Sequence, residues 1–311
     1  MPIGNAFSIL KSIKVKVPMV ELYATGLTPS GITSDSNNNL FVANNSYIIY
    51  KVDTNKTTTQ FIDLRVIPTD NESGPSVDFL DTDSSDNIYT TDSVFITPPN
   101  KTQYHFNIKK ITPSGTVTDH ITGAGSTTGI CVNGSRIFFG VKGTSGTTNS
   151  SVSLKTENIP NITSYIGKIK LPRGIAMDSK GDLYVADSGT HVIYKYVPNS
   201  FGNKIVYAGR ANQSGYLNSN TLTDSLFNQP MGICFDKYDN LYVADLSNHS
   251  IRKITPNGVI STLIGNTQGN TTGYFKDVKI SAPSDVHIAK DEAMYIADTG
   301  NSCIKKLVFE A

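Results

Sequence analysis

A short pattern recurs along the whole chain: an aromatic residue, an aliphatic or polar residue, a small residue, then Asp or Asn. The five clear copies are Phe41–Asn44, Tyr89–Asp92, Tyr184–Asp187, Tyr242–Asp245 and Tyr295–Asp298. A weaker copy, Phe138–Val141, lies between the second and third. Successive copies start 46 to 58 residues apart, a period typical of repeat folds in which each unit stacks on its neighbours. The chain therefore consists of six similar units.

Each unit reads as four short strands. In the clearest copy an apolar run, Leu171–Met177, ends at Asp178, and a polar turn leads into a second run, Leu183–Ala186. Gly, Asn and Asp supply the backbone conformations that such a turn needs. A third run, His191–Tyr196, and a more distant fourth complete the unit, and no helical period of useful length occurs. The sequence thus predicts an all-β fold, a six-bladed β-propeller with four-stranded antiparallel blades.

The strands of a unit differ in polarity. The first and second are apolar on both faces, which predicts burial on both. The third alternates apolar residues with Lys or Arg, as in Ser250–Ile254. This alternation predicts that one face of the third strand meets water.

The two ends of the chain predict how the ring closes. The sixth unit reaches Ala311 with three strands and no fourth. Near the N-terminus a strand-like segment, Val20–Gly26, has no unit of its own and is similar to the fourth strand Ile205–Gly209. We expect it to complete the last blade and so remove the exposed edges of an open ring. Residues 1–19 are then a tail or arm, and residues 20–311 form a single domain.

The repeated phrases resemble a known family. Pro-x-Gly-Ile-x-x-Asp, Leu-Tyr-Val-Ala-Asp and Ser247-Asn-His-Ser-Ile-Arg-Lys-Ile254 are similar to the NHL repeat. The resemblance is specific over residues 171–307, recognisable over 27–92 and poor over 93–165. In the poor region the third unit lacks the Pro, the Asp and much of the turn. We place its outer strands near Ser151–Lys155 and Thr163–Lys168.

Composition limits the classes of partner. The net charge of the 311 residues is +1, and charged residues make up 17%, below the roughly 25% usual for globular proteins. Since no run of Lys or Arg stands out, we expect neither a nucleic-acid partner nor an anionic membrane. The N-terminus lacks the charged and long apolar regions of a secretory signal, and no stretch has the length of a membrane span. These features favour a location inside the cell or in a larger assembly, and they leave the oligomeric state open.

Some repeated polar residues favour structural roles. An Asp ends the second strand in four units: Asp92, Asp187, Asp245 and Asp298. A catalytic residue need not recur in every blade, whereas an Asp that caps the following turn would do so. His191 and His249 occupy matching turn positions and are interpreted in the same way. Cys131 and Cys234 lie on blades that are not neighbours, and we expect all three Cys to be free thiols.

The first strands of a propeller surround its central channel. At one position the six units have Thr33, Asp81, Cys131, Ala176, Cys234 and His287; two residues earlier they have Gly31, Phe79, Gly129, Gly174, Gly232 and Asp285. Asp285 and His287 interrupt a small or apolar pattern, which marks either a function or a local hydrogen-bonded pair. At the channel mouth the position after the Pro of the repeat is Ser30, Asp78, Arg173, Met231 or Ser284.

Two functions remain open. The first is a non-enzymatic module that binds a protein, peptide or glycan, with insertions at 93–107 and 142–150 decorating one face. The alternative is a hydrolase or lyase with its site in the channel, since calcium-dependent lactonases and peptide-amidating lyases have similar propellers. The resemblance to lyases would require several channel His, and His287 is alone there. Lactonase-like sites would require convergent Asp, Glu and Asn, and Asp81 and Asp285 are the only acidic candidates.

We therefore expect no metal, no cofactor and no catalytic residue. The predicted binding site at the channel mouth consists of Ser30, Asp78, Asp81, Arg173, Met231, Ser284, Asp285 and His287.

Overall fold

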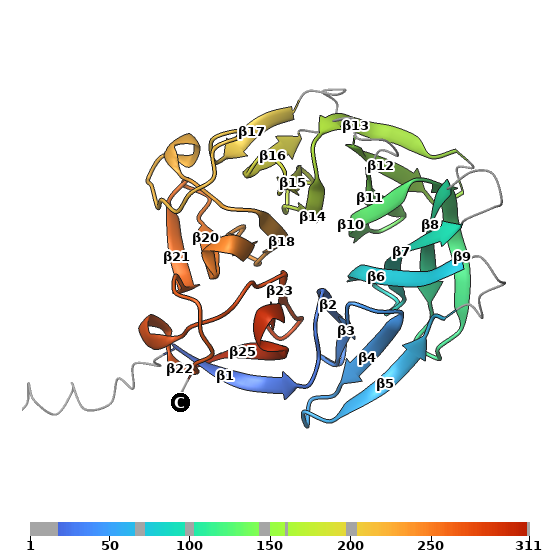
Figure 1. Ribbon diagram of the computed structural model, residues 1–311, viewed down its shortest axis with the longest axis horizontal. Helices are drawn as coiled ribbons and strands as arrows, with labels where there is room; N and C mark the ends of the chain where they lie inside the picture. Colours follow the sequence, from blue (N-terminus) through green and yellow to red (C-terminus); the bar gives the residue numbers. More distant parts are fainter. Residues whose placement is uncertain are drawn as a thin grey trace, which may run out of the picture.

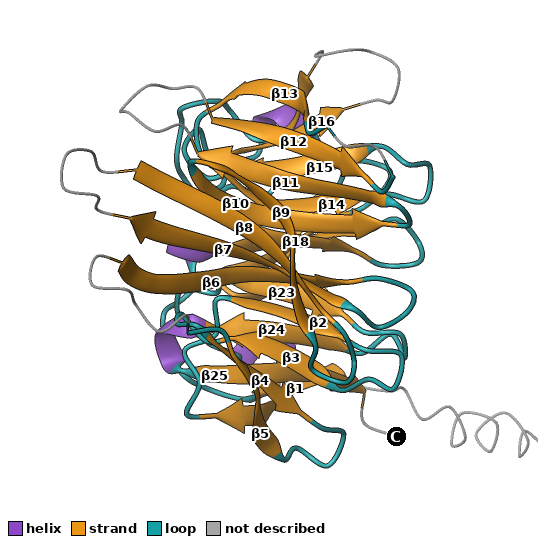
Figure 2. Ribbon diagram, turned by 90° about the vertical axis from the view of Figure 1, so that its right-hand side faces the viewer, coloured by secondary structure: helices purple, strands orange, loops and turns teal. Residues whose placement is uncertain are grey.

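The computed structural model describes residues 18–65, 72–96, 103–142, 150–158, 161–196 and 204–309. Six antiparallel sheets stand around a central axis like the blades of a propeller, which confirms the predicted fold class (Figure 1). Viewed from the side, the strands cross the ring and the connecting loops gather at its two faces (Figure 2). No helix among the described residues is long and apolar enough to cross a membrane.

Blades 1 to 5 run from an inner to an outer strand in chain order, and blade 6 is completed by β1. Blades 1 to 3 contain β2 (Gly31–Ser34), β3 (Leu40–Ala43), β4 (Ile48–Val52) and β5 (Thr58–Asp63); β6 (Glu72–Thr82), β7 (Ile88–Ile96), β8 (Gln103–Ile111) and β9 (Val117–Ala124); and β10 (Ser126–Asn133), β11 (Arg136–Lys142), β12 (Ser150–Thr156) and β13 (Thr163–Ile169). Blades 4 and 5 contain β14 (Pro172–Met177), β15 (Leu183–Asp187), β16 (Val192–Tyr196) and β17 (Lys204–Ala208); and β18 (Pro230–Phe235), β19 (Leu241–Asp245), β20 (Ser250–Ile254) and β21 (Ile260–Gly265). Blade 6 contains β23 (Asp285–Ile288), β24 (Met294–Asp298), β25 (Cys303–Phe309), β1 (Pro18–Thr25) and a short fifth strand, β22 (Gly273–Tyr274). The outer strands predicted for the third blade are therefore confirmed.

The N-terminal strand closes the ring. β1 pairs antiparallel with β25, from Pro18 opposite Phe309 to Thr25 opposite Cys303. In Figure 1 the blue β1 lies along the outer side of the red C-terminal blade. This pairing confirms the predicted closure. β1 begins at Pro18, two residues before the predicted start of the domain at Val20.

Some predictions fall on residues outside this description. They include the tail up to residue 17, positions 97–102 and 143–149 within the two insertions, and the side chain of Asp92.

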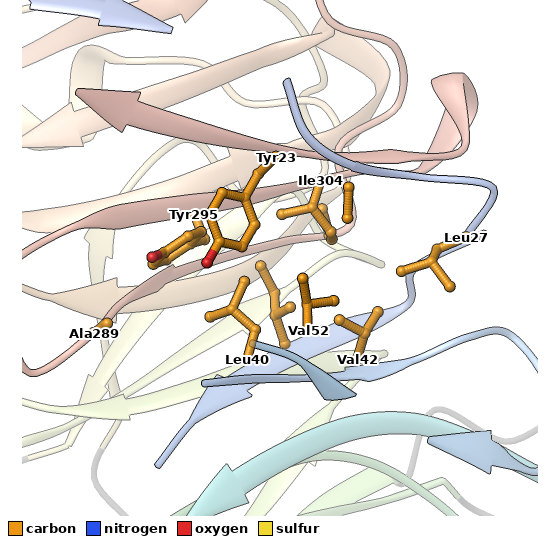
Figure 3. Packing of buried hydrophobic residues seen from close by; sticks show 11 residues of the cluster. Tyr23, Leu27, Leu40, Val42, Val52, Ala289, Tyr295 and Ile304 are labelled. Atoms are coloured by element: carbon orange, nitrogen blue, oxygen red, sulfur yellow. The ribbon is translucent and has the colours of Figure 1, made fainter. Parts of the chain in front are cut away.

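The buried apolar side chains form six clusters, one between each pair of neighbouring blades. Figure 3 shows the cluster between blades 6 and 1, to which the closing strand contributes Tyr23. The rings of Tyr23 and Tyr295 meet edge to face at 4.9 Å, and the Tyr23 hydroxyl donates to the carbonyl of Asp53. Because each blade is covered on both faces, the stability of the fold depends on contacts between blades.

The turn after each inner strand explains part of the repeat. In blade 5, Asp236 Oδ1 accepts the backbone N–H groups of Tyr238 and Asn240, both at 2.9 Å, while Oδ2 accepts from the Tyr242 hydroxyl at 3.1 Å. Lys253 lies over the ring of Tyr242, 5.5 Å from its centroid. Equivalent turn carboxylates are Asp35, Asp83 and Asp178. Three recurring residue types, the turn Asp, the Tyr and the Lys, thus form one local network.

The prediction that one face of the third strand meets water is wrong for two of its cations. Arg252 and Lys305 are both 0% exposed. Arg252 Nη1 lies 2.8 Å from Asp245 Oδ2, and Lys305 Nζ lies 2.8 Å from Asp298 Oδ2. The neighbouring blade covers this face, so the cations need a buried partner, and the Asp that ends the second strand provides it.

Candidate binding site at the ring axis

Six inner strands, β2, β6, β10, β14, β18 and β23, surround the ring axis (Figure 1). Glycines let them approach each other closely. A Cβ atom at Gly129 would lie 1.5 Å from the carbonyl oxygen of Arg173 in the next blade, and one at Gly232 would lie 1.9 Å from a carboxylate oxygen of Asp285. The N–H of Gly232 also donates to the carbonyl of Ser284 at 3.0 Å. Side chains of the inner strands therefore lie against the neighbouring blade as well as beside the axis.

Asp285 joins blade 6 to blade 1. Its Oδ2 accepts the backbone N–H of Ile32 at 2.9 Å, and its Oδ1 accepts the N–H of Val286 at 2.9 Å. Burial raises the pKa of Asp285 to about 7, and the negative charge of Asp81 adds to this shift. The carboxyl group therefore exchanges its proton near neutral pH.

His287 makes a parallel contact across the same junction. Its Nε2 lies 2.8 Å from the Ser34 hydroxyl of blade 1, and burial lowers the pKa of the imidazole to about 4. The sequence predicts that Asp285 and His287 share one face of the strand, and a hydrogen bond between them is one of two interpretations. In the structure each side chain instead bonds to blade 1.

Asp81 has the equivalent role between blades 2 and 3. Its Oδ2 accepts the N–H of Val132 at 2.6 Å, and its Oδ1 accepts the N–H of Thr82 at 2.8 Å. Burial raises the pKa of Asp81 to about 6, although these hydrogen bonds lower it. The hydroxyls of Thr33 and Thr82 join blades 1 and 2 at 2.7 Å. Polar groups of the inner strands thus connect several neighbouring blades.

Two serines at the mouth are also engaged. Ser30, 8% exposed, donates from Oγ to the carbonyl of Val77 at 3.1 Å. Ser284, 5% exposed, donates to the carbonyl of Pro29 at 3.0 Å. Their hydroxyls connect blade 1 to its two neighbours and offer little to a ligand.

Met231 reaches across the axis. It belongs to blade 5, and its side chain packs both on the apolar cluster between blades 5 and 6 and on the cluster between blades 2 and 3. Since blade 2 lies opposite blade 5 in a ring of six, the Met231 side chain obstructs the axis at this level. A ligand at this mouth would therefore meet the Met231 side chain.

Arg173 differs from these residues. It is partly buried at the start of β14. Its Nε atom is buried and has no hydrogen-bond partner among the described residues. Burial lowers the pKa of Arg173, while the negative charge of Asp78 opposes the shift. Asp78, half-buried on β6, has a polar partner of its own. Of the predicted site residues, Arg173 has the most unused hydrogen-bonding capacity.

The described part of the chain brings together no three His, Cys, Asp or Glu side chains that could hold a metal ion. Cys131, Cys234 and Cys303 are free thiols. Burial raises the pKa of each, which disfavours the thiolate that nucleophilic attack or metal binding requires.

The Asp residues that end the second strands fix the start of their own blade. Asp187, 0% exposed, accepts the N–H groups of Lys170 and Leu171 before β14. It also accepts from the N–H of Gly189 and the hydroxyl of Thr190 in the following turn. Asp245 and Asp298 differ from the expected caps, because they reach the turn through an Asn side chain and not through its backbone.

The matching histidines join neighbouring blades. His191 Nδ1 accepts the N–H of Gln229 at 3.1 Å, and His249 Nδ1 accepts the N–H of Ala282 at 3.0 Å. Both adopt positive φ angles, 63° and 50°. Their spacing in the repeat signalled a shared role, but the partner lies in the next blade and could not be deduced from that spacing.

Comparisons with known proteins agree with this architecture. The family described as NHL repeat matches residues 170–195 and 227–254. NHL repeat-containing protein 2 of Bos taurus is 41% identical over 87 residues, 27% of this chain. Protein SUPPRESSOR OF QUENCHING 1, chloroplastic, of Arabidopsis thaliana is 27% identical over 157 residues, 48% of this chain. These matches span only 12% and 15% of the relatives' own lengths.

Solved structures with this fold have varied functions. An auxiliary nutrient binding protein from Bacteroides thetaiotaomicron has a TM-score of 0.74 and 15% identity, covering 95% of this chain and 77% of its own. A gluconolactonase from Xanthomonas campestris has a TM-score of 0.61 and 11% identity, covering 96% of both chains. A streptogramin B lyase has a TM-score of 0.58 and 16% identity, covering 94% of this chain and 98% of its own. These likenesses show the fold alone, and the chain is a six-bladed β-propeller with matches to the NHL repeat at residues 170–195 and 227–254.

Proposed function

We propose that this propeller is a non-enzymatic binding module and that a ligand contacts it at the mouth of the axis, through Arg173. The observation that carries the proposal is which polar side chains at the axis already have hydrogen-bond partners and which do not. Asp81, Asp285 and His287 each bond to the next blade, whereas the buried Nε atom of Arg173 has no hydrogen-bond partner among the described residues. These contacts hold neighbouring blades together, which favours a structural role for the three side chains.

The chemistry of Arg173 indicates the kind of ligand. A guanidinium presents a planar set of donors that matches a carboxylate and binds it in bidentate fashion. Met231 adds a flexible apolar surface beside it, which suits a shallow site more than a deep pocket. We therefore propose a partner that presents a carboxylate: a peptide, a protein segment or an acidic glycan.

Binding to the immobilised full chain tests this. The probes are a set of short peptides with free C-terminal carboxylates and a panel of oligosaccharides with and without uronic acids. We expect Arg173→Met to weaken binding of the retained probes at least tenfold. Lys180→Met, an exposed lysine in the turn between β14 and β15, serves as the control and should leave binding unchanged. Equal affinity of both variants for every retained probe would refute the role of Arg173.

A specific observation favours a second candidate, a hydrolase or lyase at the axis. The pKa of Asp285 is raised to about 7, so its carboxyl group carries a proton at a pH where a general acid is useful. Solved propellers of similar fold include a gluconolactonase and a streptogramin B lyase. Lactone hydrolysis assayed with and without added Ca²⁺ or Zn²⁺ tests this candidate. Turnover that disappears in Asp285→Asn while the fold is retained would replace the binding proposal.

A further inference from the structure

The chain covers two of its own outer strand edges. In blade 5 the backbone N–H of Ile260 on β21 donates to the carbonyl of Ser219 at 2.8 Å. In blade 6 the short strand β22 pairs with Met19 and Val20 of β1. Both covering segments come from the link that precedes the blade. Unpaired strand edges attract other strands, so this cover protects blades 5 and 6.

The two covering segments have a similar sequence. One contains Gly215-Tyr216-Leu217 and the other Gly273-Tyr274-Phe275, each a glycine, a tyrosine and a large apolar residue. In blade 5 the Tyr216 hydroxyl bonds to the Thr262 hydroxyl of β21, and Asn218 Nδ2 donates to the same oxygen at 3.2 Å. An extended segment with this pattern therefore fits the outer edge of an NHL blade of this protein.

Blade 4 lacks such a cover. Its outer strand β17 pairs with β16, and nothing in the described ranges pairs with its other edge. Only Lys170 and Leu171 separate β13 from β14, so the preceding link is too short to fold back over the edge. Ile205 on β17 is 55% exposed. By contrast, the outer strands of blades 1 and 2 expose polar residues such as Thr58, Gln60 and Asp119.

A groove lies beside this open edge. It has a volume of about 440 Å³ and runs between β17 and the link that leads to blade 5. Ile205, Val206 and Tyr207 line it from β17. Leu222 and Gly258 form the other side. The groove continues the covered edge of blade 5, because its wall at 220–223 follows directly on Ser219.

We propose that the outer edge of β17 binds an extended segment of a partner protein, which adds to blade 4 as a fifth strand. The segment would carry an aromatic residue followed by an aliphatic or aromatic one, as the covering segments of blades 5 and 6 do. Main-chain hydrogen bonds to β17 provide affinity, and the groove beside Ile205 selects the apolar side chain. This surface lies at the rim of the ring and is separate from the ligand site proposed at Arg173.

A synthetic peptide that copies residues 213–221, blocked at both ends, is the probe. Its control has serine in place of the tyrosine and leucine. We expect saturable binding by fluorescence anisotropy and slower amide hydrogen exchange confined to residues 204–208. Ile205→Asp should weaken binding at least tenfold. Tyr238→Asp places the same charge at a 68% exposed aromatic residue of a distant turn, and it should bind like the wild type.

Other results would overturn the proposal. Equal binding of the serine control, or unchanged exchange at 204–208 with millimolar peptide, would show that the edge does not select this segment. Exchange at 204–208 that slows with protein concentration in the absence of peptide would make a second copy of the chain the occupant. Exchange that is slow at all concentrations, and becomes fast in a chain starting at Pro18, would assign the edge to residues 1–17.

Discussion

Blades 3 and 5 have the same four-stranded sheet but rely on different interactions. In blade 5, Asp236 organises the first turn, Asp245 pairs with buried Arg252, and His249 binds the next blade. Blade 3 has none of these residues. Its first turn is the two-residue link Gly134–Ser135, with Asn133 paired to Arg136, and Phe138 and Phe139 are 1% and 0% exposed. Apolar strands that are buried on both faces are therefore enough to build a blade.

The polar residues of the repeat also form hydrogen bonds between neighbouring blades. On the face that carries the first turns, Ser179 of blade 4 donates from its N–H and hydroxyl to Asp239 of blade 5. Ser36 of blade 1 makes the same contact with Asp86 of blade 2. The equivalent positions of blades 3 and 4 are Gly134 and Gly181, which have no side-chain acceptor. The weak repeat thus marks junctions with fewer polar contacts and not a missing blade.

Removal of the closing strand should have the largest effect. A chain lacking residues 1–26 loses β1, and with it the buried Val20, Tyr23 and Ala24. Two apolar clusters and the edge of β25 become exposed. We expect this loss to be comparable to the whole free energy of unfolding of a typical domain, roughly 5–15 kcal/mol. Thermal unfolding followed by circular dichroism measures it, and a chain starting at Pro18 is the control. Cooperative melting of the shorter chain near the control's temperature would contradict ring closure through β1.

The Asp that ends the second strand pairs with a buried cation in blade 5 but not in blade 4. Replacing it should therefore destabilise the two blades by different amounts. Asp245→Ala leaves the Arg252 guanidinium buried without its counter-ion, which costs about 3–5 kcal/mol. Asp187→Ala removes hydrogen bonds but strands no cation, because Tyr194 occupies the position of Arg252, and costs about 1–3 kcal/mol. Chemical denaturation gives both values. Equal losses would mean that the ion pair adds nothing beyond its hydrogen bonds.

The repeat made the ring, the number of blades and the closing strand predictable, because period and apolar pattern are encoded locally. The burial of Arg252 could not be predicted in this way. The rule that polar residues face water assumes that each blade has a solvent-exposed face. Nor did spacing reveal the partners of Asp285 and His287. Two residues apart on one strand they share a face, but what lies opposite depends on how blade 1 meets blade 6 after 250 residues of intervening chain. The reach of Met231 across the axis has the same origin.

The junction between blades 6 and 1 should respond to pH through two opposed groups. The folded-state pKa of Asp285 is raised to about 7, so its contribution to stability is complete below its usual pKa of 3.8 and is lost as pH rises through 7. The pKa of His287 is lowered to about 4 from 6.5, so its contribution is complete above 6.5 and is lost as pH falls through 4.

Between pH 4 and pH 6.5 the contributions of Asp285 and His287 to stability change in opposite directions. Replacing one residue at a time should expose the contribution of the other. Relative to wild type, the unfolding free energy of Asp285→Asn should increase more with pH, and that of His287→Gln should decrease more, each by about 2 kcal/mol across this range. Urea denaturation at four pH values measures the slopes. Matching pH slopes in both variants and the wild type would show that neither group is buried at the junction as described.

The smallest effect concerns the contact that blades 3 and 4 lack. Asp239 has a positive φ of 59°, which costs an ordinary residue about 1 kcal/mol, and it accepts two hydrogen bonds from Ser179. Asp239→Gly copies Gly181: it loses the acceptor but relieves the backbone, so we expect a loss of only about 0.5 kcal/mol. Asp239→Ala loses the acceptor and keeps the unfavourable φ, so it should cost about 1 kcal/mol more than the glycine variant. Denaturation of the pair side by side resolves this difference. If alanine is tolerated as well as glycine, the left-handed turn is not retained in solution, and the glycines of blades 3 and 4 do not compensate for the missing contact.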